Sequence, residues 1–346
     1  CPTCVALVRT DRGWEKTIKP RPDALDEWTH YLHDATNNAV AHDTVVGPPR
    51  RMQWIAGPKY SRHHDRMSSV SAVVTAGGRV FSIEDGASAM SILLPSKWTL
   101  TARDAFNGTV LWKRQIDHWF TQFWPLKSGP AQLPRRLVAA GDRVYVTLGY
   151  DAPFVAIDGA TGETVRTYEG SASTEEAVLS DGILFLLVNR EIELEEFSES
   201  KRFGRAYGAK FWDETQREIV AVRAETGELL WSGKYRVLPG TLAAKSDKVV
   251  FHDGESVVCL NRDSGEQMWR SEPVVRAEEI RPLHIPLLLL YEDVVLFSGR
   301  KTSGLPTGRR YPSEAANEDP MPAPPLDPDM KLWHAYHQPS GYPSPT

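Results

Sequence analysis

The sequence predicts an all-β fold, a β-propeller built from four-stranded blades. Two short patterns alternate along the chain: a strand–turn–strand hairpin, and a glycine turn followed by a bulky outgoing strand. No long stretch keeps the apolar period of a helix. Four-stranded units repeated in series are typical of propellers, whereas sandwiches and doubly wound sheets do not repeat in this way.

The glycine turn is the first repeated pattern. Its glycine tolerates the positive φ of a tight hairpin turn, and Trp112, Trp231 and Trp269 each follow four positions after such a glycine. Arg166 stands at this place in the second copy. The four copies are DAFNGTVLW (Asp104–Trp112), IDGATGETV (Ile157–Val165), RAETGELLW (Arg223–Trp231) and NRDSGEQMW (Asn261–Trp269).

The second pattern is an apolar hairpin that precedes each glycine turn. Two-residue turns such as Gly77-Gly78 separate runs rich in β-branched and aromatic residues, which is the sequence form of a hairpin. One hairpin and one glycine turn together give the four strands of a blade. The five hairpins cover Val73–Ile83, Leu137–Leu148, Val178–Val188, Ala243–Asp253 and Leu287–Gly299.

Composition excludes several classes of protein. The 40 basic and 45 acidic residues give a net charge of −5, too acidic for a general nucleic-acid binder. The most apolar stretch, Ile285–Leu290, is too short to cross a bilayer, and no signal-peptide pattern is present. Three cysteines are too few for a disulfide framework, and Cys259 is expected to be a small buried apolar residue.

The predicted domain organisation is one propeller of five to six blades over residues 27–346, incomplete or divergent at both ends. Residues 1–26 are expected to be an extension or the end of a preceding element. Two segments interrupt the repeat: a charged insertion at 190–218, expected to form a short helix or loop, and a Pro-rich insertion at 304–329, expected to be extended.

The loops that lead into the innermost strands are expected to converge at one mouth of the propeller channel. The first holds His63, His64, Asp65 and Arg66, whose imidazoles and carboxylate suit a metal ion or a general base. The five loops are Tyr60–Ser69, Gln122–Pro130, Gly170–Ala177, Val237–Thr241 and Arg276–Pro282.

Other residues of these loops complete the candidate ligand site. Glu175 and Glu176 could supply an oxygen-rich cation site, or pair with Arg66 and Lys127. Trp124, beside Lys127, could stack on a planar ligand such as a quinone. The alternative is a ring of satisfied salt bridges around a water-filled channel.

His30 and His33 form a second cluster in the segment before the first hairpin. Their spacing suits a metal on a helix, but nothing around them has a helical period. We therefore expect capping or strand-edge roles for both side chains.

The alternating hairpin and Asp-x-x-x-Gly-x-x-x-Trp patterns resemble the pyrroloquinoline-quinone-type repeat. This repeat builds quinoprotein alcohol dehydrogenases and a non-enzymatic outer-membrane assembly lipoprotein. Glu27–Trp54 resembles the opening strand of such propellers, with Trp28, Asp34, Asn38, Pro49 and Trp54 in matching places. The chain is similar to uncharacterised bacterial propellers of the planctomycete kind.

The resemblance implies two kinds of function. The first is a non-catalytic scaffold that binds a protein partner or a small ligand at the propeller face, in the periplasm or cell envelope. The second is a quinone- or metal-dependent oxidoreductase with its site at the channel mouth. Quinoprotein alcohol dehydrogenases usually carry adjacent cysteines beside the quinone and its calcium ion, and this sequence has none. Whether the chain is an enzyme is therefore open, and the scaffold is favoured.

Overall fold

The computed structural model describes most of the chain up to Gly299. The described ranges are 5–18, 24–47, 50–63, 66–117, 119–124, 129–190, 214–278, 280 and 285–299. Within them the fold is all-β, with one short 3₁₀ turn, η1 (Leu133–Arg136), and no α-helix. The all-β prediction is confirmed.

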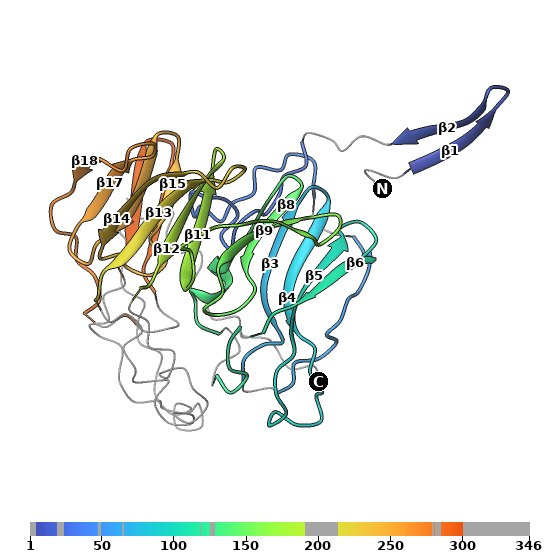
Figure 1. Ribbon diagram of the computed structural model, residues 1–346, viewed down its shortest axis with the longest axis horizontal. Coiled ribbons are helices and arrows are strands. Elements are labelled where there is room, and N and C mark those ends of the chain that lie inside the picture. Colours follow the sequence, from blue (N-terminus) through green and yellow to red (C-terminus); the bar gives the residue numbers. More distant parts are fainter. Residues whose placement is uncertain are drawn as a thin grey trace, which may run out of the picture. The chain divides into compact units, whose positions relative to one another are not determined.

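The strands form four antiparallel sheets of four strands each and two hairpins (Figure 1). Sequence order equals spatial order in every four-stranded sheet, as a propeller blade requires. Blade 1 is β3 (Val70–Ala76), β4 (Arg79–Asp85), β5 (Trp98–Asp104) and β6 (Val110–Gln115); blade 2 is β7 (Leu137–Ala140), β8 (Arg143–Thr147), β9 (Phe154–Asp158) and β10 (Thr164–Thr167). Blade 3 is β11 (Thr174–Ser180), β12 (Ile183–Val188), β13 (Arg217–Arg223) and β14 (Leu229–Tyr235); blade 4 is β15 (Ala243–Lys245), β16 (Lys248–His252), β17 (Val257–Asn261) and β18 (Gln267–Arg270).

The two hairpins lie at the ends of the described chain. Strands β19 (Leu287–Tyr291) and β20 (Val294–Ser298) are the first two strands of blade 5, and β1 (Val5–Thr10) pairs with β2 (Gly13–Ile18). Neighbouring blades touch through their first strands, in the series β3, β7, β11, β15 and β19. These five are therefore the inner strands. No described pairing joins one sheet to another, so ring closure is not seen among these strands.

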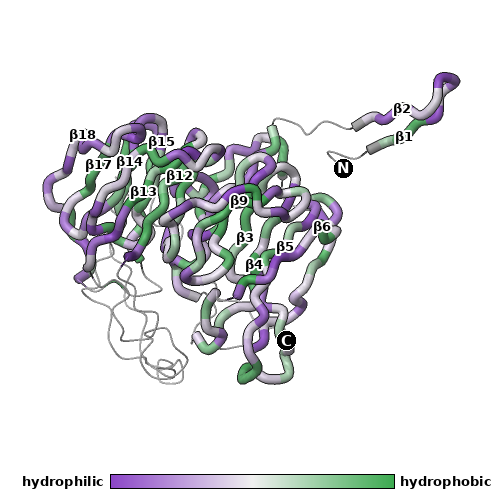
Figure 2. The backbone as a smooth tube through the Cα atoms, in the orientation of Figure 1, coloured by the Kyte–Doolittle hydropathy of each residue, from purple (hydrophilic) through white to green (hydrophobic). Residues whose placement is uncertain are grey.

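Burial explains why the middle strands are continuously apolar. All six residues of β12, ILFLLV, are buried, because a blade is covered by a neighbour on both faces. The outermost strand β6 instead alternates between exposed and half-buried residues. Figure 2 shows the same contrast along the backbone, with apolar colouring concentrated in the inner part of the blades.

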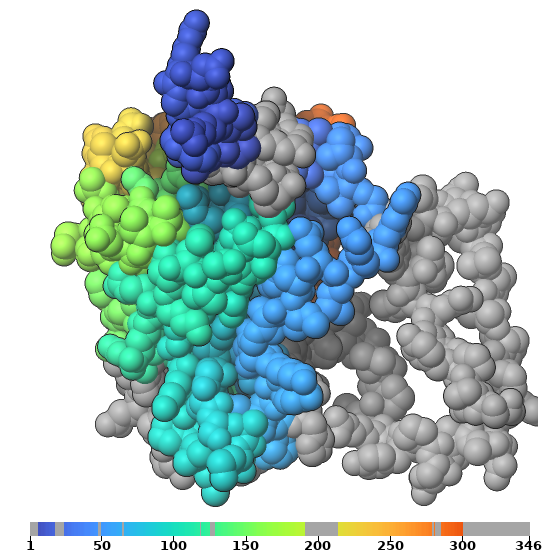
Figure 3. Space-filling view, turned by 90° about the vertical axis from the view of Figure 1, so that its right-hand side faces the viewer, coloured from blue at the N-terminus to red at the C-terminus, as the bar shows by residue number. Residues whose placement is uncertain are grey.

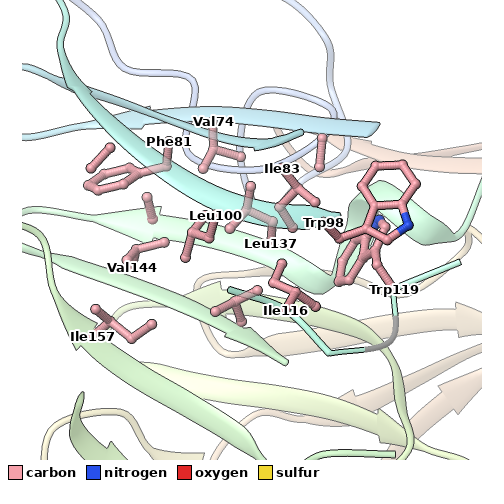
Figure 4. Close-up of a cluster of buried hydrophobic side chains, with 14 of the residues drawn as sticks. Val74, Phe81, Ile83, Trp98, Leu100, Ile116, Trp119, Leu137, Val144 and Ile157 are labelled. Atoms are coloured by element: carbon pink, nitrogen blue, oxygen red, sulfur yellow. The ribbon is translucent and has the colours of Figure 1, made fainter. Parts of the chain in front are cut away.

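The core consists of apolar layers between consecutive blades. The layer between blades 1 and 2 contains Phe81, Trp98, Leu100 and Leu137 (Figure 4). Similar layers separate blades 2 and 3, blades 3 and 4, and blades 4 and 5. Cys259 is fully buried in the last of these, as expected from the sequence, and burial raises the pKa of its thiol to about 11.

The repeated tryptophan of one blade packs on the repeated glycine of the next blade. The Trp112 indole N–H donates to the Gly159 carbonyl at 2.9 Å, and its ring lies against Gly162 in the outer turn of blade 2. Trp231 packs in the same way on Gly265, and Trp54 on Gly108. In the remaining case the Arg166 side chain packs on Gly227. The repeated residues therefore make contacts to a neighbouring blade rather than within their own blade.

We expect Gly162→Ala to destabilise the protein by about 2 kcal/mol more than Gly182→Ala. Both glycines have a φ of 78°, but an added Cβ at Gly162 would lie 2.6 Å from Trp112, whereas nothing lies within 4 Å at Gly182. The matched pair separates steric conflict from backbone strain. Urea denaturation of both variants measures the difference, and equal losses would contradict the proposed tryptophan contact.

The five predicted hairpins and the four glycine turns are all confirmed. The predicted opening strand in Glu27–Trp54 is wrong, because the described part of this segment has no strand and only an isolated bridge between His30 and His33. Most of the charged insertion and all of residues 304–329 lie outside the described residues. The last residues of the insertion, from Arg217, already belong to β13.

Candidate functional site

Residues 28–37, here called the strap, run across the inner strands of all five blades. Each inner strand donates one backbone N–H to it from its penultimate residue. The bonds are Thr75 to Trp28 O at 2.7 Å, Ala139 to Thr29 O at 2.9 Å, Leu179 to His30 Nε2 at 3.0 Å, Ala244 to Ala35 O at 2.8 Å and Leu290 to Thr36 O at 2.9 Å. One irregular segment thus satisfies equivalent donors of five blades, which explains why it does not form a strand.

His30 is the only side chain among these strap acceptors, and it must be neutral to act as one. Its Nε2 accepts the Leu179 N–H, so Nδ1 carries the proton and donates to Thr29 Oγ1 at 2.7 Å. Burial lowers the pKa of His30 to about 4. His33 is also buried, with Nε2 2.7 Å from Asp26 Oδ2. Both histidines therefore have structural roles, as the sequence led us to expect.

Asn37 connects the strap to a buried charged network. Its side-chain amide donates to the carbonyls of Leu242 and Leu288, and its Oδ1 accepts Arg135 Nη1 at 3.0 Å. The same Arg135 nitrogen lies 2.8 Å from Glu176 Oε1. Glu176 Oε2 accepts the Gly240 N–H at 3.2 Å.

This network joins blades 2, 3 and 4 at their loop end, meaning the end where the inner strands begin. Arg135 lies in η1 directly before β7, Glu176 lies near the start of β11, and Gly240 precedes β15. Glu176 is fully buried, and burial raises the pKa of its carboxyl against the opposing effect of the Arg135 guanidinium. Loss of either residue would leave the other as a buried charge without a counter-charge, so the Arg135–Glu176 pair depends on both partners.

Glu175 forms a second buried pair, with a partner from another strand. Arg217 Nε donates to Glu175 Oε2 at 3.0 Å, and Asn189 Nδ2 donates to Glu175 Oε1 at 2.9 Å. The described ion-pair partners of Glu175 and Glu176 are therefore Arg217 and Arg135, and the alternative pairing with Arg66 and Lys127 stays a prediction. These arginines come from η1 and from the first residue of β13, about 40 residues away in sequence, so no local pattern indicated the pairs.

Arg136 differs from its neighbour Arg135 because it has no acidic partner in the described structure. The residue is only 5% exposed, and its Nε and Nη1 are buried without a hydrogen-bond acceptor. The guanidinium carbon lies 4.4 Å from the centre of the Tyr150 ring, in the β8–β9 loop. Burial raises the pKa of Tyr150, whose surroundings include the charges of Arg136, Glu175 and Arg217. Among the described residues, Arg136 thus contacts Tyr150 and has no carboxylate partner.

The predicted cluster in the first loop is only partly described. Met67 N–H donates to the Trp124 carbonyl at 3.0 Å, and Arg66 Nη1 donates to the Phe123 carbonyl at 3.1 Å, so the first two loops do meet. The Trp124 indole N–H is buried without a partner, and its ring lies edge-on to Phe120. His63 is described, whereas His64, Asp65 and Lys127 lie outside the described residues.

The described residues hold no group of three His, Cys, Asp or Glu side chains arranged to bind a metal ion. The ligand site built from His63, His64, Asp65, Arg66, Trp124, Lys127, Glu175 and Glu176 therefore stays a prediction. Sequence reasoning missed Asn37, Arg135, Arg136 and Tyr150. The adjacent arginines directly before the apolar run LVAA were the one available signal, since charged residues rarely enter an inner strand unpaired.

Comparison with known proteins supports the fold. Residues 215–305 match the family model described as outer membrane protein assembly factor BamB. The chain is thus similar to propellers of pyrroloquinoline-quinone type, as the repeat predicted. No curated protein matches.

Two solved structures that this chain resembles are a quinohemoprotein alcohol dehydrogenase and a BamB protein. Quinohemoprotein alcohol dehydrogenase from Comamonas testosteroni is 15% identical with a TM-score of 0.42, covering 76% of this chain and 46% of that one. BamB from Moraxella catarrhalis is 18% identical with a TM-score of 0.31, covering 59% of this chain and 58% of that one. The chain spans about half the length of these structures.

Proposed function

We propose that this protein is a non-catalytic binding propeller that takes a small oxyanion, a carboxylate or a phosphate, at Arg136. The unpaired Arg136 guanidinium is the observation that carries the proposal. Leaving a buried cation without a counter-ion costs several kcal/mol, and such a cost is retained where a ligand supplies the missing charge. Arginine suits this role because its planar fork binds carboxylate and phosphate oxygens in pairs.

The position of Tyr150 supports a ligand rather than a purely structural role. Its ring stacks on the guanidinium and fixes the plane in which the N–H groups point. An anion that binds the buried Nε and Nη1 would therefore have to displace the Tyr150 side chain or approach from its other side. The hydroxyl of Tyr150 could then donate to a bound oxygen.

Two observations favour binding over catalysis. Arg217 and Asn189 engage both oxygens of Glu175, and Arg135 and the Gly240 N–H engage both oxygens of Glu176. Arg62 pairs with Asp85 at 3.0 Å in the same way. These carboxylates are therefore engaged in structural hydrogen bonds and ion pairs.

The oxidoreductase alternative would require a quinone and a calcium ion at this end of the blades. Calcium takes six to eight oxygen ligands, and the described carboxylates do not fit it because arginine and amide donors already engage them. The buried, unpartnered Trp124 indole N–H is the one feature that favours a planar ligand.

A role with a protein partner in the cell envelope is part of the same proposal. It is supported by the partial match to the assembly factor BamB, over residues 215–305. Of the residues that the structure describes, none belongs to a helix long and apolar enough to span a bilayer.

Titration calorimetry with citrate and with inorganic phosphate tests the oxyanion site. We expect saturable binding of one of these anions to the intact chain, and a loss of affinity of about 10- to 100-fold in Arg136→Met. Arg143→Met is the matched control, because Arg143 is an arginine of the same blade that pairs with Asp158 at 2.7 Å.

The two arms identify the oxyanion, since citrate offers carboxylates and phosphate does not. Equal affinity of the wild type and Arg136→Met, or equal losses in both arginine variants, would refute the site. Binding of pyrroloquinoline quinone with calcium, and not of either anion, would favour the oxidoreductase.

A further inference from the structure

A pocket of about 270 Å³ lies between blades 3 and 4 at their loop end, where β14, β16 and β18 end. The outer strands of both blades contribute to its wall, so it opens at the rim of the propeller. Its volume is close to the lower limit of ligand pockets and suits one small ring rather than a chain. The lining residues are Gln216, Lys234, Tyr235, Arg236, Phe251, Asp253, Val258, Gln267 and Arg270.

A glycine at one repeated position explains why the groove between these two blades stays open. Two residues after the repeated tryptophan position, blade 1 has Arg114 and blade 2 has Tyr168. Arg114 Nη1 donates to the Gly162 carbonyl of blade 2 at 2.6 Å, and Tyr168 is buried against blade 3. Figure 3 shows the side of blade 1, in cyan, adjoining blade 2, in green. Blade 3 has Gly233 at this position, so no side chain crosses the groove from it.

Gly233 also makes room for the aromatic ring of Tyr235, which forms one wall of the pocket. A Cβ added at Gly233 would lie 2.6 Å from Tyr235 Cε2, so the ring lies directly over this glycine. The same ring packs on Phe251 of blade 4, with 5.3 Å between the ring centres. Glycine inside a strand often marks such a close approach. Contacts with both blades therefore fix the aromatic face.

Ion pairs hold two guanidinium groups at the edge of the pocket. Asp253 Oδ2 lies 2.6 Å from Arg270 Nη1, and Asp253 Oδ1 accepts the N–H groups of Glu255 and Ser256. The Glu255 carboxylate lies 3.6 Å from Arg236 and 3.5 Å from Arg270. Each guanidinium has five N–H donors, so both keep donors for a ligand after these pairs are formed.

Lys234 supplies a positive charge that these pairs do not neutralise. Among the described residues it forms no ion pair, because Glu218, which lies opposite it on β13, pairs with Arg190 at 2.7 Å. The lining therefore carries three cationic side chains and one carboxylate. A ligand with a single negative charge complements this balance.

We propose that this pocket binds one acidic sugar ring, a hexuronate. The face of an aromatic ring carries the negative part of its quadrupole and attracts the C–H groups of a sugar ring. The amides of Gln216 and Gln267 and the planar guanidinium groups suit neighbouring sugar hydroxyls, and Lys234 holds the carboxylate. Phosphate fits less well, because it would leave the aromatic wall and the amides without contacts. The proposal does not depend on the oxyanion site at Arg136.

Titration calorimetry with methyl glucuronide and methyl glucoside tests the pocket, since these sugars share the ring and differ in the carboxylate. The proteins are the wild type, Lys234→Gln and Gly233→Ala. Lys248→Gln is the matched control, because Lys248 lies in blade 4 outside the pocket and pairs with Asp247. Arg136→Met separates this pocket from the oxyanion site, since a glucuronide also carries a carboxylate.

We expect saturable binding of the glucuronide to the wild type, with the glucoside binding about 10-fold more weakly. Lys234→Gln should lose about 10-fold in affinity for the glucuronide, because a hydrogen bond between charged groups is lost. Gly233→Ala should lose a similar factor although it removes no ligand contact, because the added Cβ displaces the Tyr235 ring. Lys248→Gln and Arg136→Met should keep the wild-type affinity.

Three results would overturn the proposal. The first is no saturable binding of the glucuronide. The second is equal affinity for the glucuronide and the glucoside, which would remove the role of the charge at Lys234. The third is wild-type affinity in Lys234→Gln together with a loss in Arg136→Met, which would assign the glucuronide to the oxyanion site.

Discussion

Arg135→Met should destabilise the protein by about 3–5 kcal/mol at pH 7, whereas Arg136→Met should leave stability unchanged within about 1 kcal/mol or raise it. The two arginines are neighbours in η1 and equally buried, yet only Arg135 has a carboxylate partner, Glu176. Removing Arg135 leaves Glu176 buried without its counter-charge and removes the Asn37 contact. Removing Arg136 removes an unpaired charge and its contact with Tyr150.

Urea denaturation at pH 7 measures both variants, and the double variant Arg135→Met/Glu176→Gln is the control. Because this double variant has no stranded carboxylate, it should recover part of the stability lost in Arg135→Met. Large losses of similar size in both single variants would mean that Arg136 is structural, and the proposed ligand site would lose its main support.

The free energy of unfolding should rise by about 3 kcal/mol as the pH increases from about 4 to 6.5, counting the contribution of His30 alone. Burial lowers the pKa of His30 from 6.5 to about 4 in the folded state, so the unfolded chain binds more protons within this window. The contribution is therefore complete above pH 6.5 and lost as the pH falls through the window. Protonated His30 cannot accept the Leu179 N–H, and the strap then loses its contact with β11.

The matched variant is His30→Gln, whose amide oxygen can accept the same N–H without titrating. The free energy of unfolding is measured for both proteins at pH 4.5, 5.5 and 7.0, and the difference between them isolates His30. Burial also lowers the pKa of His252, which therefore adds a slope of the same sign to both proteins. A pH profile shared by the wild type and His30→Gln would refute the neutral, buried role of His30.

The fold could be predicted because its determinants are local. A positive φ requires glycine in each outer turn, and a bulky residue follows four positions later, as Trp269 follows Gly265. Buried middle strands such as β12 read as continuous apolar runs. Each of these patterns spans only a few residues, so it can be recognised in the sequence without knowledge of the tertiary structure.

The buried charged network of Asn37, Arg135 and Glu176 could not be predicted because its members are far apart in sequence. Asn37 donates to Leu288, 251 residues away, and Arg135 reaches both Asn37 and Glu176. The strap has no periodic pattern, since its acceptors are spaced by the geometry of five blades. Its resemblance to an opening strand was therefore misleading. A lone arginine such as Arg136 also has no pattern that distinguishes it from its paired neighbour.

A difference electron-density map from crystals grown with the bound oxyanion, citrate or phosphate, tests the central claim most directly. The account predicts density for a carboxylate or phosphate group in hydrogen-bond contact with the Arg136 guanidinium, with the Tyr150 ring rotated away from it. Density confined to other surfaces, with Tyr150 still stacked on an unliganded Arg136, would contradict it.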